Sequence, residues 1–466
     1  MSPDPTTSKA FSILSHYRTL RSTYKFLQKS QWWSAAEIEA YQLQRLKTLM
    51  THAYANVPYY HAAFNERGLV PSDIRDLTDL ERLPILTKET ARENMDALKA
   101  RNIAAHDLEF VGTSATTGMT FGFYYEKGTS RARELGFVRS AWARVGYRFT
   151  DKCATLRGGL VSSHGATKID QKKLFGRMLA LSSVLMTAES LPRYIQLIRK
   201  FKPRHIWGFP SSISMLAHFM HDNDVEHFST VKSILCGSET LFEWQRKLLE
   251  DVFQCRVFSW YGQSEQVAFA SECEVSQLYH VSPEYGIFEL VDTADRPITE
   301  AGKVGEIVAT GFNNAATPFI RYRTGDLAQY ADATCECGRH HALLSRIEGR
   351  ANEFVVGRTG REIPVTAFRV NRGTLFTSDF DLVRQFQFFQ DKPGELILNI
   401  VPGKDYGKRV SGQMFAALKE QLGGEVDLEV RLVNHIPRTE AGKHRWLIQK
   451  LTVRLDQQPL ELEVVV

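Results

Sequence analysis

The fold is decided by three apolar segments that follow one another at short intervals: KPRHIWGF (202–209), VKSILCGSE (231–239) and CRVFSWYG (255–262). The stretches between them are amphipathic, which predicts helices over 213–221 and 244–253. Short apolar strands that alternate with amphipathic helices are typical of βαβ units. The sequence therefore predicts an α/β fold with a largely parallel sheet in the middle of the chain.

The segments on either side of this centre differ in character. Residues 15–65 are largely helical in pattern, and Pro58 ends one of the helices because it disfavours helical geometry in the residue before it. From Phe288 onward, short strands separated by Gly and Asp turns predict antiparallel hairpins.

After Arg350 a second composition begins. Strongly alternating segments at 353–365, 385–401 and 426–433, with a helix expected over 406–421, indicate a small α+β domain. We therefore expect a large N-terminal domain of mixed sheets with helices and a β-rich part, residues 1–349, and a small C-terminal domain, residues 350–466.

Composition excludes several classes of protein. The chain has 466 residues, of which 43% are hydrophobic and 24% charged, so it is globular rather than disordered. A net charge of +5 over this length does not indicate a nucleic-acid binder. No apolar run approaches the roughly 18 residues of a membrane span, and the start lacks the pattern of a secretory signal. Six cysteines are too few for a disulfide scaffold, so we expect a cytoplasmic protein.

Four short motifs carry chemistry, and each has a plain structural reading beside the functional one. GTSATTG (112–118) suits an anion-binding turn but lacks the spacing of a Walker loop, and by itself such a run is more often a simple surface loop. WYGQSE (260–265) suits a nucleotide base and a metal ion, or is a capped strand-to-helix turn. In FIRYRTGDL (319–327), Asp326 accepts from a sugar diol or pairs with Arg323. IPRTEAGK (436–443) presents one lysine, which by itself is an ordinary surface charge.

The order of these motifs resembles the adenylate-forming superfamily of acyl-CoA synthetases, peptide-synthetase adenylation domains and luciferases. CGSETL (236–241) is similar to the adenine-side segment of that family, and IEGR (347–350) to its hinge region. The resemblance covers nearly the whole chain and is strongest to the phenylacetate–CoA ligase group, in its CapK-like branch. Further features of that branch are NVPYY (56–60), LPILTKE (83–89) and Cys-x-Cys-Gly-Arg (335–339).

The resemblance implies a role for each matching residue. The phosphates of ATP would be held by Thr113, Ser114, Thr116, Thr117 and Gly118. The adenine and ribose would be held by Gly237, Ser238, Glu239, Tyr261, Gly262, Asp326 and Arg350. Glu265 would hold Mg²⁺, and Lys443 would be the catalytic lysine of a mobile C-terminal lid with its hinge near 350–353. Ala115 replaces a loop glycine of the family, and Asn352-Glu353 replaces an acidic pair at the hinge.

The implied reaction joins a carboxylic acid to AMP with release of pyrophosphate. The acyl group would then pass to coenzyme A or to an amine acceptor, the latter on a glycan precursor if the CapK likeness extends to polysaccharide biosynthesis. Two alternatives are transfer of AMP to a hydroxyl-bearing molecule and a non-catalytic scaffold of the same fold. Relatives of this type are commonly homodimers.

A structural zinc site is the last expectation. Cys335 and Cys337 form a C-x-C pair in a turn, while Cys273 and His280 lie close together shortly after the YGQSE motif. If both segments lie near the nucleotide end of the large domain, three thiolates and one imidazole complete a tetrahedral site with no open position. His340 and His341 are competing ligands.

Overall fold

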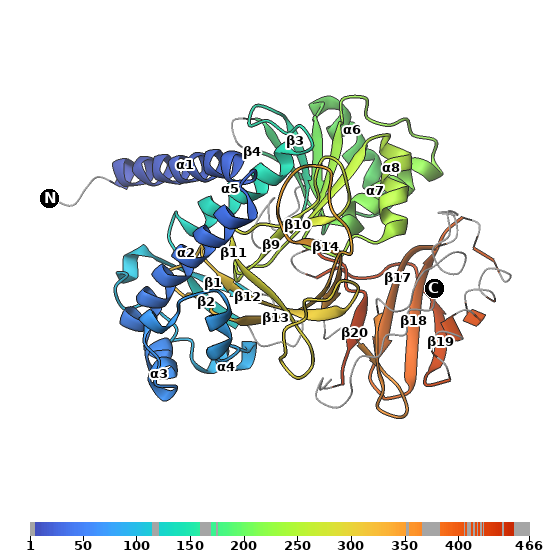
Figure 1. Cartoon of the computed structure of the whole chain (residues 1–466). Helices are drawn as coiled ribbons and strands as arrows, with labels where there is room; N and C mark the ends of the chain where they lie inside the picture. The colour runs from blue at the N-terminus through green and yellow to red at the C-terminus, as the bar shows by residue number, and fades with distance from the viewer. Residues whose placement is uncertain are drawn as a thin grey trace. The chain divides into compact units, whose positions relative to one another are not determined.

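The computed structural model describes residues 5–113, 121–158, 169–173, 176–350, 354–365, 383–404, 424–439 and 442–451, together with 406, 407, 412, 415, 416, 418, 419 and 422. Figure 1 shows the chain and its elements. The α-helices are α1 (Pro5–Ser30), α2 (Ala35–Asn56), α3 (Pro58–Glu66), α4 (Lys88–Glu93), α5 (Ser130–Ala143), α6 (Leu191–Phe201), α7 (Pro210–Asp222) and α8 (Glu243–Phe253). Short 3₁₀ turns cover Pro71–Asp73 (η1), Thr78–Arg82 (η2) and Ala105–Asp107 (η3).

The strands fall into an early, a middle and a late group. The early and middle strands are β1 (Leu108–Thr113), β2 (Phe121–Glu126), β3 (Cys153–Leu156), β4 (Asp170–Lys173), β5 (Met178–Leu181), β6 (His205–Gly208), β7 (Ser233–Gly237), β8 (Arg256–Gly262), β9 (Phe269–Ser271), β10 (Tyr279–Val281), β11 (Gly286–Val291), β12 (Val304–Gly311), β13 (Tyr322–Tyr330) and β14 (Leu343–Arg350). The late strands are β15 (Phe354–Val356), β16 (Glu362–Pro364), β17 (Val383–Gln390), β18 (Glu395–Pro402), β19 (Asp427–Leu432) and β20 (Leu447–Gln449).

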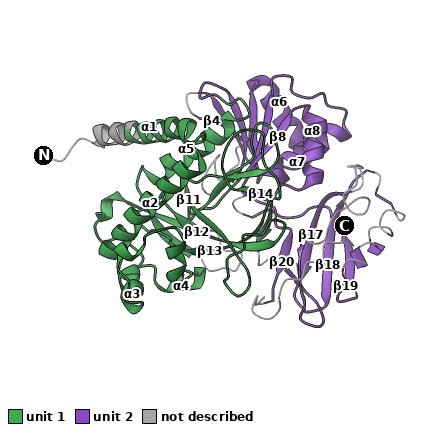
Figure 2. Cartoon of the chain, in the orientation of Figure 1, with its two compact units in different colours: residues 1–147, 260–347 green, residues 148–259, 348–466 purple. Residues whose placement is uncertain are grey.

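The described chain packs as two compact units, shown in green and purple in Figure 2. Unit 1 comprises residues 1–147 and 260–347, and unit 2 comprises residues 148–259 and 348–466. Strand β8 is divided between them. The expected division into residues 1–349 and 350–466 remains a prediction.

Unit 2 contains the predicted parallel core. Its strands lie in the order β8-β7-β6-β3-β5-β4, and the pairs β3–β5, β3–β6 and β6–β7 are parallel. Strand β7 is buried along its whole length, as expected for a strand covered by helices on its faces. Helix α6 belongs to the same hydrophobic core as β7. Its buried residues recur at three- and four-residue steps along one stripe: Leu191, Tyr194, Ile195, Ile198 and Phe201.

The late strands of unit 2 form the predicted α+β part. A four-stranded sheet has the order β19-β18-β17-β20, in which β17 and β18 are antiparallel and the outer pairs are parallel. Strands β15 and β16 form a separate hairpin. The helix expected over 406–421 lies largely outside the described residues.

Unit 1 contains the predicted antiparallel hairpins. Strands β11, β12 and β13 pair antiparallel in sequence order, and β10 pairs antiparallel with both β14 and β9. Helices α2 and α3 are separated at Val57, whose extended backbone precedes Pro58, and α2 begins with a capping box between Ser34 and Glu37. No helix in the described ranges has the length and apolar character that crossing a bilayer requires.

Candidate functional site

Unit 1 brings Tyr261, which was predicted to frame the adenine, beside Asp326, which was predicted to bind the ribose. Tyr261 lies near the end of β8 and Asp326 within β13, and the Tyr261 hydroxyl donates to Asp326 Oδ2 at 2.7 Å. Burial, helped by the Asp326 charge, raises the pKa of Tyr261 well above its ordinary value. The phenol therefore remains a donor at any physiological pH and holds one carboxylate oxygen of Asp326 in place.

The predicted magnesium ligand is oriented in the same way. Glu265 follows β8 and is partly buried, and its Oε1 accepts a hydrogen bond from the Tyr322 hydroxyl at 3.1 Å. Two tyrosines from neighbouring segments thus each position one carboxylate. Carboxylate oxygens are ligands that Mg²⁺ prefers, usually together with phosphate oxygens of the substrate.

Two details of the predicted motif need correction. Asp326 lies inside strand β13, not in a turn, and the chain accommodates the motif through a register shift opposite Glu306 and a positive φ of 75° at Gly325. Arg323 is not the partner of Asp326, because its guanidinium pairs with Asp295 and with Glu306 at 3.3 Å. Both differences arise from cross-strand neighbours that a local motif does not reveal.

Unit 2 places the predicted adenine-side residues at the end of β7. Gly237 is the last residue of the strand, and Ser238 has a left-handed φ of 68°, which turns the chain sharply before Glu239. Glu239 Oε2 accepts from the backbone N–H of Ser211 at 3.2 Å, and Oε1 accepts from the N–H of His444 at 2.9 Å. This carboxylate therefore links helix α7 to the segment that carries Lys443.

The lysine loop is held by a residue that sequence reasoning missed. Arg438 Nη1 donates to the hydroxyls of Ser211 and Ser212, at 2.9 and 3.0 Å, and to the Gly442 carbonyl at 3.0 Å. Arg438 directly precedes the Thr of the PRTEAGK motif, and this position could have marked it as a functional residue.

The loop also closes on itself and presents its lysine to an aromatic ring. The Lys443 N–H donates to Thr439 Oγ1 at 3.0 Å, and the Thr439 N–H donates to the Lys443 carbonyl at 2.9 Å. Lys443 Nζ lies 6.0 Å from the centre of the Phe209 ring, just after strand β6. The loop conformation thus directs the lysine side chain toward the end of the parallel sheet.

Part of the predicted site lies outside the described residues. These are Ser114, Thr116, Thr117 and Gly118 of the phosphate loop, with Ala115 between them, and the hinge residues Asn352 and Glu353. Thr113 ends β1, where its backbone pairs with Phe121, and Arg350 ends β14. The side chains of Thr113 and Arg350 are not among those described. Gly262 is the last residue of β8.

The four predicted zinc ligands converge within unit 1. One ligand atom from each of Cys273, His280, Cys335 and Cys337 lies within 4.8 Å of the others. Cys273 Sγ is 3.5 Å from Cys335 Sγ, and Cys337 Sγ is 3.7 Å from His280 Nε2. Zinc bonds of about 2.1–2.3 Å at tetrahedral angles place neighbouring ligand atoms about 3.6–3.8 Å apart, so the donor set fits this ion.

The surroundings of the cluster hold its side chains in place. The backbone N–H groups of Val275 and Ser276 both donate to Cys273 Sγ at 3.3 Å. Burial lowers the pKa of His280 to about 3, so its ring is neutral. The ring of His341 lies 5.8 Å from that of His280, but His341 is not part of the converging set.

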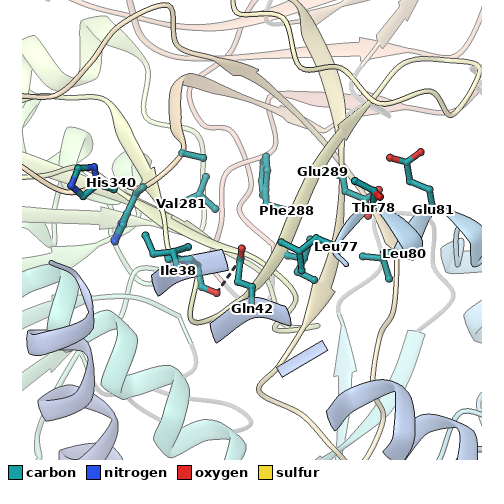
Figure 3. Close-up of a pocket in the computed structure, with 14 residues that line it drawn as sticks. Ile38, Gln42, Leu77, Thr78, Leu80, Glu81, Val281, Phe288, Glu289 and His340 are labelled. Carbon is teal, nitrogen blue, oxygen red and sulfur yellow. Dashed lines mark hydrogen bonds between the residues drawn. The ribbon is translucent and has the colours of Figure 1, made fainter. Parts of the chain in front are cut away.

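A cavity of about 320 Å³ lies elsewhere in unit 1 (Figure 3). Apolar residues of α2, η2, β10 and β11 and of the segments between them form part of its wall, and His340 and Glu81 are among its polar residues. None of the motif residues or converging cysteines lines it. We therefore do not assign the catalytic site to this cavity.

The chain is similar to several known proteins. Residues 369–450 match the family described as the CapK C-terminal domain. The chain is 25% identical to protein CapK of Staphylococcus aureus over 422 residues, which cover 88% of this chain and 89% of that protein. It is 27% identical to phenylacetate-coenzyme A ligase of Thermus thermophilus over 446 residues, covering 88% and 96%. A solved 2-hydroxyisobutyryl-CoA ligase in complex with 2-HIB-AMP superposes with a TM-score of 0.70 at 20% identity, covering 90% and 92%.

Proposed function

Since the chain is an enzyme of the adenylate-forming ligase type, similar to CapK and to phenylacetate–CoA ligases, we propose that its second substrate is coenzyme A and that Lys443 is its catalytic lysine. The general activity is ATP-dependent activation of a carboxylic acid. The observation that carries the residue assignment is the anchoring of the PRTEAGK loop by Arg438 and Glu239, which directs Lys443 toward Phe209.

The first step makes an acyl-AMP. A carboxylate oxygen of the acid attacks the α-phosphorus of ATP, the bond to the bridging oxygen breaks, and pyrophosphate leaves with the electron pair. Two anions approach each other, so the protein must supply position and positive charge rather than a covalent nucleophile. Lys443 would supply one such charge at the bridging oxygen and the carboxylate.

Residues of the predicted nucleotide motifs would position ATP. Asp326, held by Tyr261, would accept from the ribose hydroxyls, while Gly237, Ser238 and Glu239 would frame the adenine. Glu265 would hold Mg²⁺, whose charge offsets that of the phosphates. The loop residues 113–118 would bind the β- and γ-phosphates.

The second step transfers the acyl group to the thiol of coenzyme A. A hinge at 350–353 would let residues 350–466 swing Lys443 away after adenylation, which is the gating logic of a closing lid. An amine on a glycan precursor is the alternative acceptor, and the similarity to CapK is its support. Transfer of AMP to a hydroxyl-bearing molecule differs from both because AMP would stay in the product.

We also propose that Cys273, His280, Cys335 and Cys337 hold one structural zinc ion. Four protein donors leave no open position, so this ion would hold the β9–β10 segment to the turn after β13 and take no part in the reaction. No cysteine of the described chain is in a disulfide, which agrees with the cytoplasmic location proposed here.

The test is carboxylate-dependent exchange of pyrophosphate into ATP. A panel of aryl, fatty, amino and uronic acids is assayed without coenzyme A or amine, and exchange with one class would establish acyl-AMP formation and name the acid. Coenzyme A added to the active acid should then yield a thioester by mass. Failure of every acid in protein that binds ATP would contradict the proposal and favour AMP transfer.

A further inference from the structure

Arg157 occupies an unusual position at the end of the parallel sheet. It follows strand β3, and its guanidinium carbon lies 4.9 Å from the centre of the Trp207 ring and 4.7 Å from that of Phe209. Trp207 and Phe209 are two residues apart at the end of β6, so their side chains point to the same side of the sheet. A guanidinium over two aromatic faces is attracted by both rings and held in one orientation.

The polar contacts of this guanidinium are few. Nη2 donates to Ser238 Oγ at 2.9 Å, and within the described ranges Arg157 has no ion pair with a carboxylate. The charge of Glu239 acts on Arg157 from a distance and partly offsets the effect of burial on its pKa, while the two oxygens of Glu239 accept from the N–H groups of Ser211 and His444. Burial lowers the pKa of Arg157 to about 10, which still leaves it charged at neutral pH.

Burying a cation destabilises a protein when no ion pair offsets the loss of water. Arg157 is partly exposed, so a ligand can reach guanidinium N–H groups other than the one that donates to Ser238. A guanidinium with free in-plane donors is suited to a carboxylate, which it binds through two parallel hydrogen bonds. The structure thus combines a desolvated positive charge with an accessible edge.

The same ring also receives the lysine. Lys443 Nζ lies 6.0 Å from the centre of Phe209, and the Arg157 guanidinium lies 4.7 Å from that centre. The distance between the two cationic groups is therefore at most the sum of these values. One cation faces the carboxylate that would be activated, and the other remains for a second anionic group.

We propose that Arg157 forms a second anion subsite that selects acids carrying a further anionic group, such as dicarboxylates. This inference rests on the proposed function, because it assigns the substrate class of that same acid. Trp207 and Phe209 would pack against the carbon skeleton between the two carboxylates, and only the carboxylate nearer Lys443 would react. The aromatic wall favours an organic acid over a phosphate of the nucleotide, which has no apolar part to place there.

The test compares matched acids in pyrophosphate exchange. Each pair has one skeleton with one or two carboxylates: butyrate and succinate, valerate and glutarate, toluate and terephthalate. The wild type should give a higher kcat/KM for the dicarboxylate of the accepted pair. Arg157→Met should lower that value at least ten times more than the value for the monocarboxylate, since hydrogen bonds between charged groups contribute roughly ten- to hundred-fold. Arg157→Lys should retain part of the preference.

The control variant is Arg193→Met, which removes an exposed arginine of α6 in the same unit and should change neither acid. A wild-type preference for monocarboxylates, or an equal loss on both acids in Arg157→Met, would overturn the subsite. A rise in KM for ATP or pyrophosphate with every acid would assign Arg157 to the phosphates and overturn it too. Silence of the wild type with all acids would instead refute the proposed function, and the two failures are thus distinguished.

Discussion

The hydrogen bond from Tyr261 to Asp326 can be removed without changing the shape of the site. Tyr261→Phe keeps the ring and deletes only the hydroxyl, which lies 2.7 Å from Asp326 Oδ2. Hydrogen bonds to a charged acceptor contribute roughly 1.5–3 kcal/mol. Since 1.4 kcal/mol corresponds to a factor of about ten, the KM for ATP should rise roughly ten- to hundred-fold.

The chain supplies a matched comparison in a second tyrosine that donates to a carboxylate. Tyr322→Phe makes the same change, but it removes the donor to Glu265, at 3.1 Å, instead of the donor to Asp326. It should shift the Mg²⁺ concentration for half-maximal exchange and affect the KM for ATP less. The two variants therefore separate ribose binding from metal binding.

The assay is pyrophosphate exchange with ATP and with its 2′- and 3′-deoxy analogues. In wild type, the KM should be higher for at least one deoxy analogue than for ATP. In Tyr261→Phe this difference should be smaller, because no hydroxyl at position 261 orients Asp326. Burial keeps the phenol protonated, so the effect should not vary between pH 6 and 9. An unchanged KM for ATP, or an undiminished penalty for the deoxy analogues, would refute the assignment of Asp326 to the ribose.

Three further predictions follow from named contacts. Lys443→Ala should lower adenylate formation at least ~100-fold with an unchanged circular dichroism spectrum, and normal exchange in this variant would contradict the assigned lysine. Metal analysis of chelator-washed protein should find one zinc per chain. Cys337→Ser should lose this zinc and unfold at a lower temperature. A zinc content far below one per chain in wild type would exclude the site. Burial raises the pKa of Glu134, which accepts from Tyr285, to about 7, so the unfolded chain ionises first and stability falls as pH rises from about 4.5 to 7. At pH 8, urea titration should therefore give Glu134→Gln a free energy of unfolding roughly 2–3 kcal/mol higher than that of wild type. A free energy of unfolding that depends on pH as in wild type would contradict this.

The sequence predicted the fold from patterns that are local. Apolar segments such as 202–209 and 231–239 became β6 and β7, and the alternation after residue 288 became the antiparallel strands β11 to β13. The cluster of three cysteines and one histidine was also predictable. The C-x-C spacing limits two of its members to one turn, and only their meeting with Cys273 and His280 required the fold.

The rest depended on contacts between distant segments. Glu239 was expected beside adenine, but its hydrogen bond to the N–H of His444 spans more than two hundred residues and leaves no local trace. Arg438 and Arg157 were overlooked for the same reason, since an arginine seen alone is most often a surface charge. Asp326 was assigned to a turn because the bulge in β13 depends on its partner strand.

Gly442 allows the lysine loop to pack closely against Ser183 and Gly158. A side chain there would overlap Ser183 Oγ and lie 3.0 Å from the backbone of Gly158, and its φ of 80° also disfavours other residues. Gly442→Ala would thus keep the side chains of Lys443, Arg438 and Glu239 but would prevent the loop from packing against Ser183 and Gly158. Under the proposed function, we expect Gly442→Ala to lower adenylate formation more than acyl transfer from an adenylate supplied from outside.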